Sequence, residues 1–198
     1  ALEQLLKYYP SADTWQRVLD GYISKTKHDD ELLSLYRLAE DVGALTKPRQ
    51  YTDMSQALVV AGFAIEGQRV IEKGIAAGVF QGEEVARAQR TLDSAKRRAD
   101  VERKDLPQAA AKLAAARTGD EMHSVGRLYF SAGEYSKAAD ALRKALAKGG
   151  LSDVDAADML LGIALSRDGK TADANKAFAA VKDPKFAEVA KLWVLKGR

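Results

Sequence analysis

Residues 119–150 read GDEMHSVGRLYFSAGEYSKAADALRKALAKGG, and residues 155–184 read DAADMLLGIALSRDGKTADANKAFAAVKDP. The two stretches align when Gly126 is set on Gly162, because small and large apolar residues then fall at matching positions. Self-similarity at a period of about 20 to 50 residues is typical of repeat architectures. The other matched pairs are Tyr129 with Leu165, Gly133 with Gly169, Ala138 with Ala174, Leu142 with Phe178 and Ala145 with Val181.

The apolar spacing within each stretch predicts two helices joined by a tight turn at Gly133 or Gly169. One helical hairpin cannot bury its apolar face alone, whereas stacked hairpins share a continuous core. Small residues such as Gly126 and Ala138 let neighbouring helices approach closely. No segment reads as a strand, so we expect above about 65% helix and essentially no strand.

The first stretch is similar to the tetratricopeptide repeat (TPR) family, whose unit is a pair of helices. The family's pattern has a large apolar, an apolar, a small and an aromatic residue in the first helix, followed by small, aromatic and small residues in the second. The resemblance implies an all-α fold, a right-handed superhelical α-solenoid of antiparallel helix hairpins. The residues that fill the pattern are Met122, Val125, Gly126, Tyr129, Ala138, Leu142 and Ala145.

The same resemblance predicts a single TPR-like solenoid over residues 1–198. We expect it to be a fragment of a longer chain, because the apolar pattern of Leu2, Leu5, Leu6 and Tyr9 begins without a capping residue. That first helix should expose part of its apolar face or cover it with another chain. The expected parts are divergent repeats over 1–81, a degenerate unit with one long charged helix over 82–118, two clear repeats over 119–184 and a C-terminal capping helix over 185–198.

Composition excludes several classes of protein. The 198 residues are 46% hydrophobic and 30% charged, which argues against disorder. The absence of cysteine excludes disulfide scaffolds and thiolate metal sites. The chain lacks an apolar run long enough to cross a membrane, so no direct membrane insertion is expected. The segment EKGIAAG at 72–78 resembles exported bacterial TPR proteins and implies a periplasmic or exported location, with the cytoplasm as the alternative.

Two motifs resemble ligand-binding loops but lack an essential residue. Residues 169–171, Gly-Lys-Thr, copy the end of a phosphate-binding loop, yet Ala164 stands where that loop needs glycine. A calcium loop beginning at Asp168 would place Ala179 at its twelfth position, where a glutamate is required. We therefore expect no cofactor at either place.

The two histidines and the serines predict no catalytic or metal site. His28 and His123 are each without a second histidine at metal-ligand spacing. The charges between Arg87 and Lys104 alternate in sign, which is typical of a solvated helix face with ion pairs. No aromatic residue lies in that stretch to stack on bases, so nucleic acid is not an expected partner.

The TPR resemblance implies that the inner face of the solenoid binds a protein or peptide partner. The chain is accordingly expected to be a non-enzymatic interaction scaffold. The alternatives are a structural or spacer domain of a larger bacterial envelope protein, and a helical enzyme with a site assembled from distant residues. The residues expected to line the groove are His123, Arg127, Phe130 and Ser131 in the first clear repeat, and Met159, Ile163, Ser166 and Arg167 in the second.

Arg127 and Phe130 are the expected centre of that groove, because arginine and aromatic side chains carry much of the energy of protein interfaces. Neither occupies a packing position of the repeat pattern. Their replacement by alanine is therefore expected to abolish binding with little change in stability. Replacement of Tyr129 or Ala138, which do occupy packing positions, is expected to damage the fold.

Overall fold

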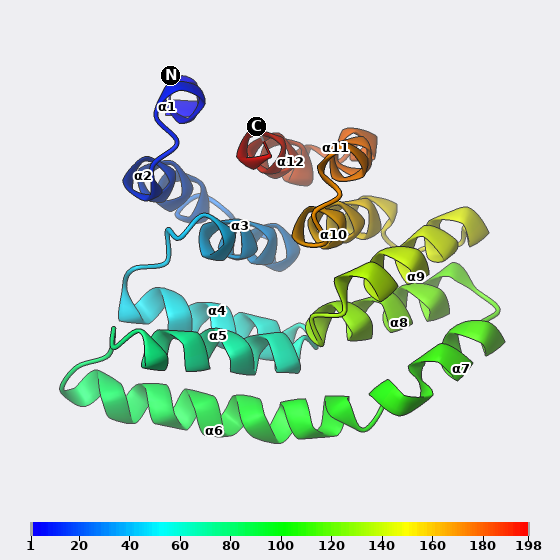
Figure 1. Ribbon diagram of the computed structural model, residues 1–198, viewed down its shortest axis with the longest axis horizontal. Coiled ribbons are helices and arrows are strands. Elements are labelled where there is room, and N and C mark those ends of the chain that lie inside the picture. The colour runs from blue at the N-terminus through cyan, green and yellow to red at the C-terminus, as the bar shows by residue number, and fades with distance from the viewer. Residues whose placement is uncertain (1, 198) are drawn as a thin grey trace. The chain divides into compact units, whose positions relative to one another are not determined.

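The computed structural model describes residues 2–197 and shows a helical chain (Figure 1). Helices hold 78% of these residues, and no strand occurs among them, so the expected all-α fold is confirmed. The helices are α1 (Leu2–Tyr8), α2 (Ala12–Ile23), α3 (Asp29–Asp41), α4 (Pro48–Val60), α5 (Ala64–Ala76), α6 (Glu83–Arg103), the 3-10 turn η1 (Leu106–Gln108), α7 (Ala109–Ala115), α8 (Gly119–Ser131), α9 (Tyr135–Lys148), α10 (Val154–Arg167), α11 (Thr171–Ala180) and α12 (Pro184–Lys196).

The chain divides into two compact units, each with its own packing. The terminal unit comprises the described residues up to Leu45 and those from Asp153 onward. It holds α1, α2, α3, α10, α11 and α12. The central unit comprises Thr46–Ser152 and holds α4 to α9. The terminal unit therefore joins segments that lie far apart in the sequence.

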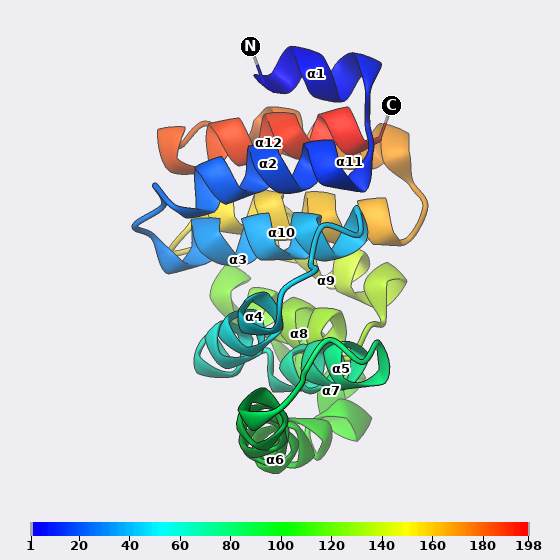
Figure 2. The same cartoon turned by 90° about the vertical axis from the view of Figure 1, so that its left-hand side faces the viewer.

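The last helix, α12, ties the terminal unit together. It packs against α3 and α1 as well as against α10 and α11 (Figure 2). Its residue Trp193 is buried, and the indole Nε1 donates a hydrogen bond of 3.2 Å to the carbonyl oxygen of Ser34 in α3. The ring also stacks on Phe178 of α11, with 5.8 Å between centroids. One aromatic side chain thus links the two ends of the chain.

Glycine allows the close helix approach that the sequence predicts in both clear hairpins. A Cβ atom built on Gly126 in α8 would lie 2.8 Å from the side chain of Leu142 in α9. A Cβ atom on Gly162 in α10 would clash with the ring of Phe178 in α11. The two glycines and their two partners are the residues that the alignment matches. The repeated stretches therefore form hairpins of the same kind.

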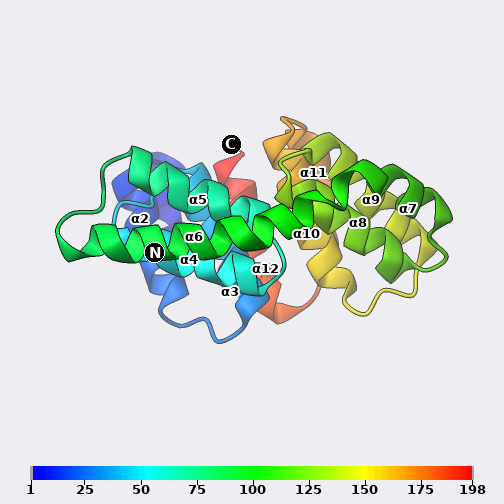
Figure 3. The same cartoon turned by 90° about the horizontal axis from the view of Figure 1, so that it is seen from below.

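The central unit contains the long charged helix that the sequence predicts. Helix α6 spans Glu83–Arg103 and packs against both α4 and α5 (Figure 3). Helix α8 pairs with α9 and contacts α7 and α5. A narrow stripe of α6 is buried, at the three- and four-residue spacing of an amphipathic helix. The stripe consists of Ala88, Thr91, Leu92, Ala95 and Ala99.

The first helix exposes part of its apolar face, as the sequence predicts. Leu5 of α1 is exposed, and so is Tyr9 just after the helix, whereas Leu6 is buried. Helix α3 begins at Asp29, and its N-cap is His28. Residues 1 and 198, which belong to the first expected repeat and to the expected capping helix, lie outside the described structure, as does the side chain of Leu2.

Replacement of Gly162 by alanine is expected to lower the free energy of unfolding by about 1–3 kcal/mol, because the buried Phe178 ring is held against Trp193 and cannot yield easily. Gly21 in α2 is the control, because no neighbouring atom lies within 4 Å of its built Cβ atom. Gly21→Ala should raise stability by up to about 1 kcal/mol through helix propensity. Urea unfolding measures both; equal stabilisation by the two substitutions would contradict the close packing.

Asp158 in α10 predicts a pH dependence of stability. Burial raises the pKa of this carboxyl group from 3.8 to about 6, and the charge of Asp155 adds to the rise against the opposing effect of Lys182. The folded state therefore holds the proton more tightly than the unfolded state. This contribution to stability is complete below about pH 4 and is lost as the pH rises through about 6.

Asp158→Asn is accordingly expected to stabilise the protein at pH 7.5 by about 1–2 kcal/mol, with the benefit shrinking at pH 4.5. Asp13→Asn, at an exposed position in α2, controls for the loss of one negative charge. Urea unfolding of both variants at the two pH values measures the effect. An Asp158→Asn benefit that does not depend on pH would contradict the raised pKa.

Candidate functional site

The structure places the predicted groove residues in two different units and buries half of them. His123, Arg127, Phe130 and Ser131 lie on α8 in the central unit, and Met159, Ile163, Ser166 and Arg167 lie on α10 in the terminal unit. The four buried side chains, with at most 1% of their surface exposed, are Phe130, Ser131, Met159 and Ile163.

Phe130 is a core residue of the central unit, contrary to the expectation that it lies outside the packing. Its ring makes edge-to-face contacts with Phe63 at 6.0 Å and with Tyr135 at 5.4 Å between centroids. The repeat pattern contains only residues on the face of α8 that packs against α9. Contacts between α8 and α5 bury a second face of α8, and Phe130 lies there.

Ser131 and Glu102 cap the N-terminus of α5 from other helices. The N-cap residue of α5 is Phe63, whose side chain cannot accept a hydrogen bond. The Ser131 hydroxyl accepts a hydrogen bond of 3.3 Å from the backbone N–H of Glu66, and the Glu102 carboxylate accepts one of 2.9 Å from the N–H of Ile65. Because free N–H groups at a helix start need acceptors, these two side chains have a structural role.

Arg127 also has a partner inside the central unit. Its guanidinium donates a hydrogen bond to the carbonyl oxygen of Ala61, which caps the C-terminus of α4, and lies 4.3 Å from the centroid of the Phe63 ring. A cation at this place is favourable, because the last carbonyl groups of a helix carry partial negative charge. Arg127 therefore has a role in packing, contrary to the expectation that it lies outside the packed positions, and its replacement is expected to lower stability.

Arg167 belongs to a largely buried ion-pair network in the terminal unit. Only 7% of its side chain is exposed, and it contacts Glu40 at 3.2 Å and Asp41 at 3.0 Å. Lys196 of α12 binds the other oxygen of Asp41 at 2.7 Å and lies 3.3 Å from the hydroxyl of Ser166. Arg167 and Ser166 thus help to join α10, α12 and the end of α3.

His123 is half-buried on α8 and acts weakly on its neighbour Asp120. Hydrogen bonds from the hydroxyl and the backbone N–H of Ser152 hold the pKa of Asp120 below its usual value, and the charge of His123 adds a smaller effect in the same direction. No group of metal-ligating side chains is found between residues 2 and 197. His123 therefore gives no indication of a metal site.

A cleft of about 600 Å³ lies beside α7 and α8, but the structure itself uses its charged side chains. Lys112 binds Asp105 at 2.7 Å, and the Glu121 carboxylate accepts hydrogen bonds from backbone N–H groups at the start of α8. Arg127 and Glu102, which also line this cleft, bind helix ends as described above. The cleft leaves few charged groups for a ligand.

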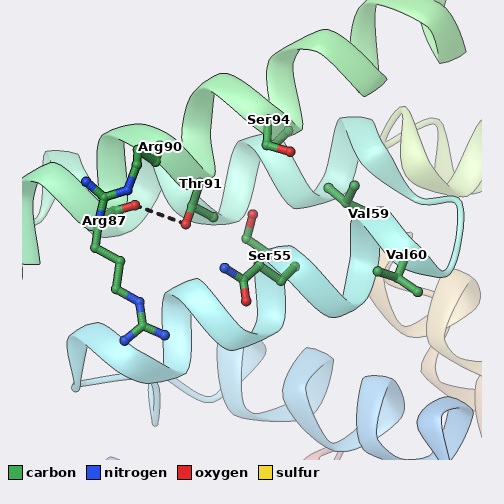
Figure 4. A pocket seen from close by; sticks show the side chains of 9 residues that line it. Ser55, Val59, Val60, Arg87, Arg90, Thr91 and Ser94 are labelled. Carbon is green, nitrogen blue, oxygen red and sulfur yellow. Dashed lines mark hydrogen bonds between the residues drawn. The ribbon is translucent and has the colours of Figure 1, made fainter.

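A second cleft, of about 420 Å³, lies between α4 and α6, and we call it the α4–α6 cleft (Figure 4). Figure 4 shows Arg87 and Arg90 at one end of it and Val59 and Val60 at the other. Between them lie polar side chains from both helices. The lining residues are Ser55, Gln56, Val59, Val60, Arg87, Arg90, Thr91, Ser94 and Ala95.

The arginines of the α4–α6 cleft differ from Arg127 and Arg167 in having no bound partner. Within residues 2–197, no carboxylate forms an ion pair with the side chain of Arg87 or Arg90, and no acidic residue lines the cleft. The alternating charges of α6 predict a face with many ion pairs, whereas Arg103 with Asp100 is the ion pair that the described structure gives this helix. These two cations are exposed and available to a ligand.

The sequence holds a weak signal for this site. Arg87 and Arg90 are three residues apart and therefore lie on one face of a helix. Glu83, Glu84 and Asp93 lie three or four residues from these arginines, yet none of them forms an ion pair with Arg87 or Arg90 in the described structure, so alternation along the chain does not imply pairing in space. Tertiary packing places the α4 side of the cleft against α6, so the sequence of α6 alone does not predict it.

No protein-family model matches the chain, and no curated protein matches it. None of the helices between residues 2 and 197 has the length and apolar character needed to cross a membrane. The candidate site therefore stands on the geometry of the α4–α6 cleft.

Arg127→Ala is expected to lower the free energy of unfolding by about 1–3 kcal/mol, because it leaves the Ala61 carbonyl without its donor and removes the contact with Phe63. Arg49→Ala is the matched control, since Arg49 is exposed and pairs with Asp53 within α4. Its effect should stay below about 0.5 kcal/mol. Thermal and urea unfolding measure both, and equal effects would contradict the structural role of Arg127.

Proposed function

We propose that the protein is a non-enzymatic helical scaffold that binds a peptide segment of a partner protein in the α4–α6 cleft. The observation that carries this proposal is the combination of two exposed arginines without partners and an exposed valine around one cleft. Arginine side chains that the fold does not use, held on a rigid scaffold, are available to bind another molecule.

The composition of the cleft supports binding rather than catalysis. Its polar side chains are arginine, serine, threonine and glutamine, and it has no histidine, carboxylate or lysine that could act as a general base. The hydroxyl of Ser55 donates to the carbonyl oxygen of Gly67 at 2.9 Å, so this serine is held by the backbone and not by a base. The lining residues of the cleft therefore offer no general base for a reaction.

The proposal includes a TPR-like arrangement of the hairpins, in which first helices of neighbouring hairpins line the binding surface. Its support is the contact of α4 with α6 and the matched glycine contacts of the two clear hairpins. This proposal also changes which residues are expected to bind the partner. The cleft uses α4 and α6, whereas the resemblance places the groove on α8 and α10.

Selection from a library of random twelve-residue peptides tests the proposal. Ser94 is exposed, so Ser94→Tyr fills the α4–α6 cleft without changing its charge. Ser136→Tyr places the same side chain at an exposed position of α9 and serves as the control. Peptides selected on the wild-type protein should bind Ser136→Tyr equally and lose at least tenfold in affinity for Ser94→Tyr.

Two outcomes would contradict the proposal. Selected peptides that bind Ser94→Tyr as well as the wild type would place the binding surface elsewhere. Selection that yields no binding peptide would favour a spacer domain, which needs no partner in the cleft. Equal melting temperatures of the two tyrosine variants ensure that a loss of affinity does not reflect unfolding.

A further inference from the structure

The ends of the α4–α6 cleft differ in chemistry, and we infer that the cleft selects an extended peptide carrying a carboxylate side chain and an apolar side chain three residues apart. The inference rests on the proposed function and adds the kind of peptide that binds. The carboxylate lies at Arg87 and Arg90, and the apolar side chain lies against Val59 and Val60.

The cationic end determines the sign of the ligand's charge. Arg87 and Arg90 lie one helical turn apart on the exposed surface of α6, and both line the cleft. A guanidinium group binds a carboxylate through two parallel hydrogen bonds, and because it is weakly hydrated it pays a smaller desolvation penalty than an ammonium group. No acidic side chain lines the cleft, so a carboxylate of the ligand does not compete there with one of the protein's own.

The middle of the cleft offers polar groups to a peptide backbone. The hydroxyl groups of Ser55 and Thr91 donate to the carbonyl oxygens of Gly67 and Arg87, at 2.9 and 3.1 Å. The Gln56 amide and the Ser94 hydroxyl are exposed and have no such internal bond in the described structure. An extended peptide needs donors and acceptors for its own N–H and C=O groups, and these two side chains supply them.

The apolar end explains an exposed valine. Val60 has 86% of its surface exposed, and Val59 beside it is half-buried. A single exposed valine is ordinary on a protein surface, but this one forms the end of a cleft that already has a charged end. An apolar side chain of the ligand would bury Val60 and gain about 25 cal/mol for each Å² removed from water.

The length of the cleft gives the spacing in the ligand. Arg87 and Ser94 are seven residues apart on α6, which corresponds to about 10 Å along a helix. A peptide in the extended polyproline II conformation advances about 3.1 Å per residue and has three residues per turn, so side chains three positions apart lie on one face. A carboxylate at the arginines and an apolar side chain at the valines therefore belong to residues three positions apart.

The apolar end also distinguishes a peptide from a nucleic acid. Single-stranded nucleic acids would supply anionic groups for the arginines, but they bind through aromatic side chains that stack on bases. The α4–α6 cleft contains no aromatic residue. Valines at one end and arginines at the other match an amphipathic peptide better.

The test uses fluorescein-labelled ten-residue peptides of serine and glycine that contain one glutamate and one leucine three positions apart. Fluorescence anisotropy compares this probe with peptides in which glutamine replaces the glutamate or serine replaces the leucine. Each replacement should weaken binding at least fivefold. The double variant R87Q/R90Q should weaken binding of the glutamate peptide by a similar factor and leave the glutamine peptide unchanged.

The control variant R97Q/R98Q removes the same charge from exposed positions of α6 that do not line the cleft, and it should bind the glutamate peptide like the wild type. Equal binding of the glutamate and glutamine peptides, or equal losses in the two double variants, would overturn the inference. Binding of a twelve-nucleotide single-stranded RNA that depends on Arg87 and Arg90 and exceeds that of the peptide would overturn it as well.

Failure of this inference can be distinguished from failure of the proposed function. If library peptides bind in a manner that Ser94→Tyr blocks, but carry no acidic residue, the scaffold function stands and the inference fails. If no peptide binds the wild-type protein, the proposed function fails and the inference fails with it.

Discussion

The carboxylates at the end of α3 and the cations that neutralise them hold the terminal unit together. Glu40 and Asp41 lie in the last turn of that helix, where negative charge is unfavourable because the helix dipole is negative there. Arg167 of α10 and Lys196 of α12 compensate both charges across sequence-distant helices. Because removal of one partner from a buried ion pair costs about 3–5 kcal/mol, the two ends of the chain depend on this network.

The four arginines considered for binding differ in the partners they have. Arg127 and Arg167 bind a helix C-terminus and buried carboxylates, so their charges are already compensated inside the fold. Arg87 and Arg90 are exposed at a cleft without an acidic residue. A ligand gains more from charges that the fold has not used, which is why the α4–α6 cleft is the better candidate for binding.

Local patterns predicted most of the fold and little of the site. The matched glycines, the long charged helix and the last helix could be found from spacing alone, because each depends on residues close in the chain. The inward direction of Phe130 could not, since α5 covers that face of α8 and its position is a tertiary result. The pairing of Arg167 with α3 was equally hidden, because the two partners are separated in sequence by the whole central unit.

Native-state hydrogen exchange tests most directly whether the network at the end of α3 joins the two ends of the chain. The amide hydrogens of α3 and α12 should exchange with the same free energy of opening, since neither helix keeps its core without the other. Arg167→Met should lower the protection of both helices by the same amount, while the protection in α4 and α5 stays nearly unchanged. Loss of protection in α3 alone, with α12 still protected, would contradict the account.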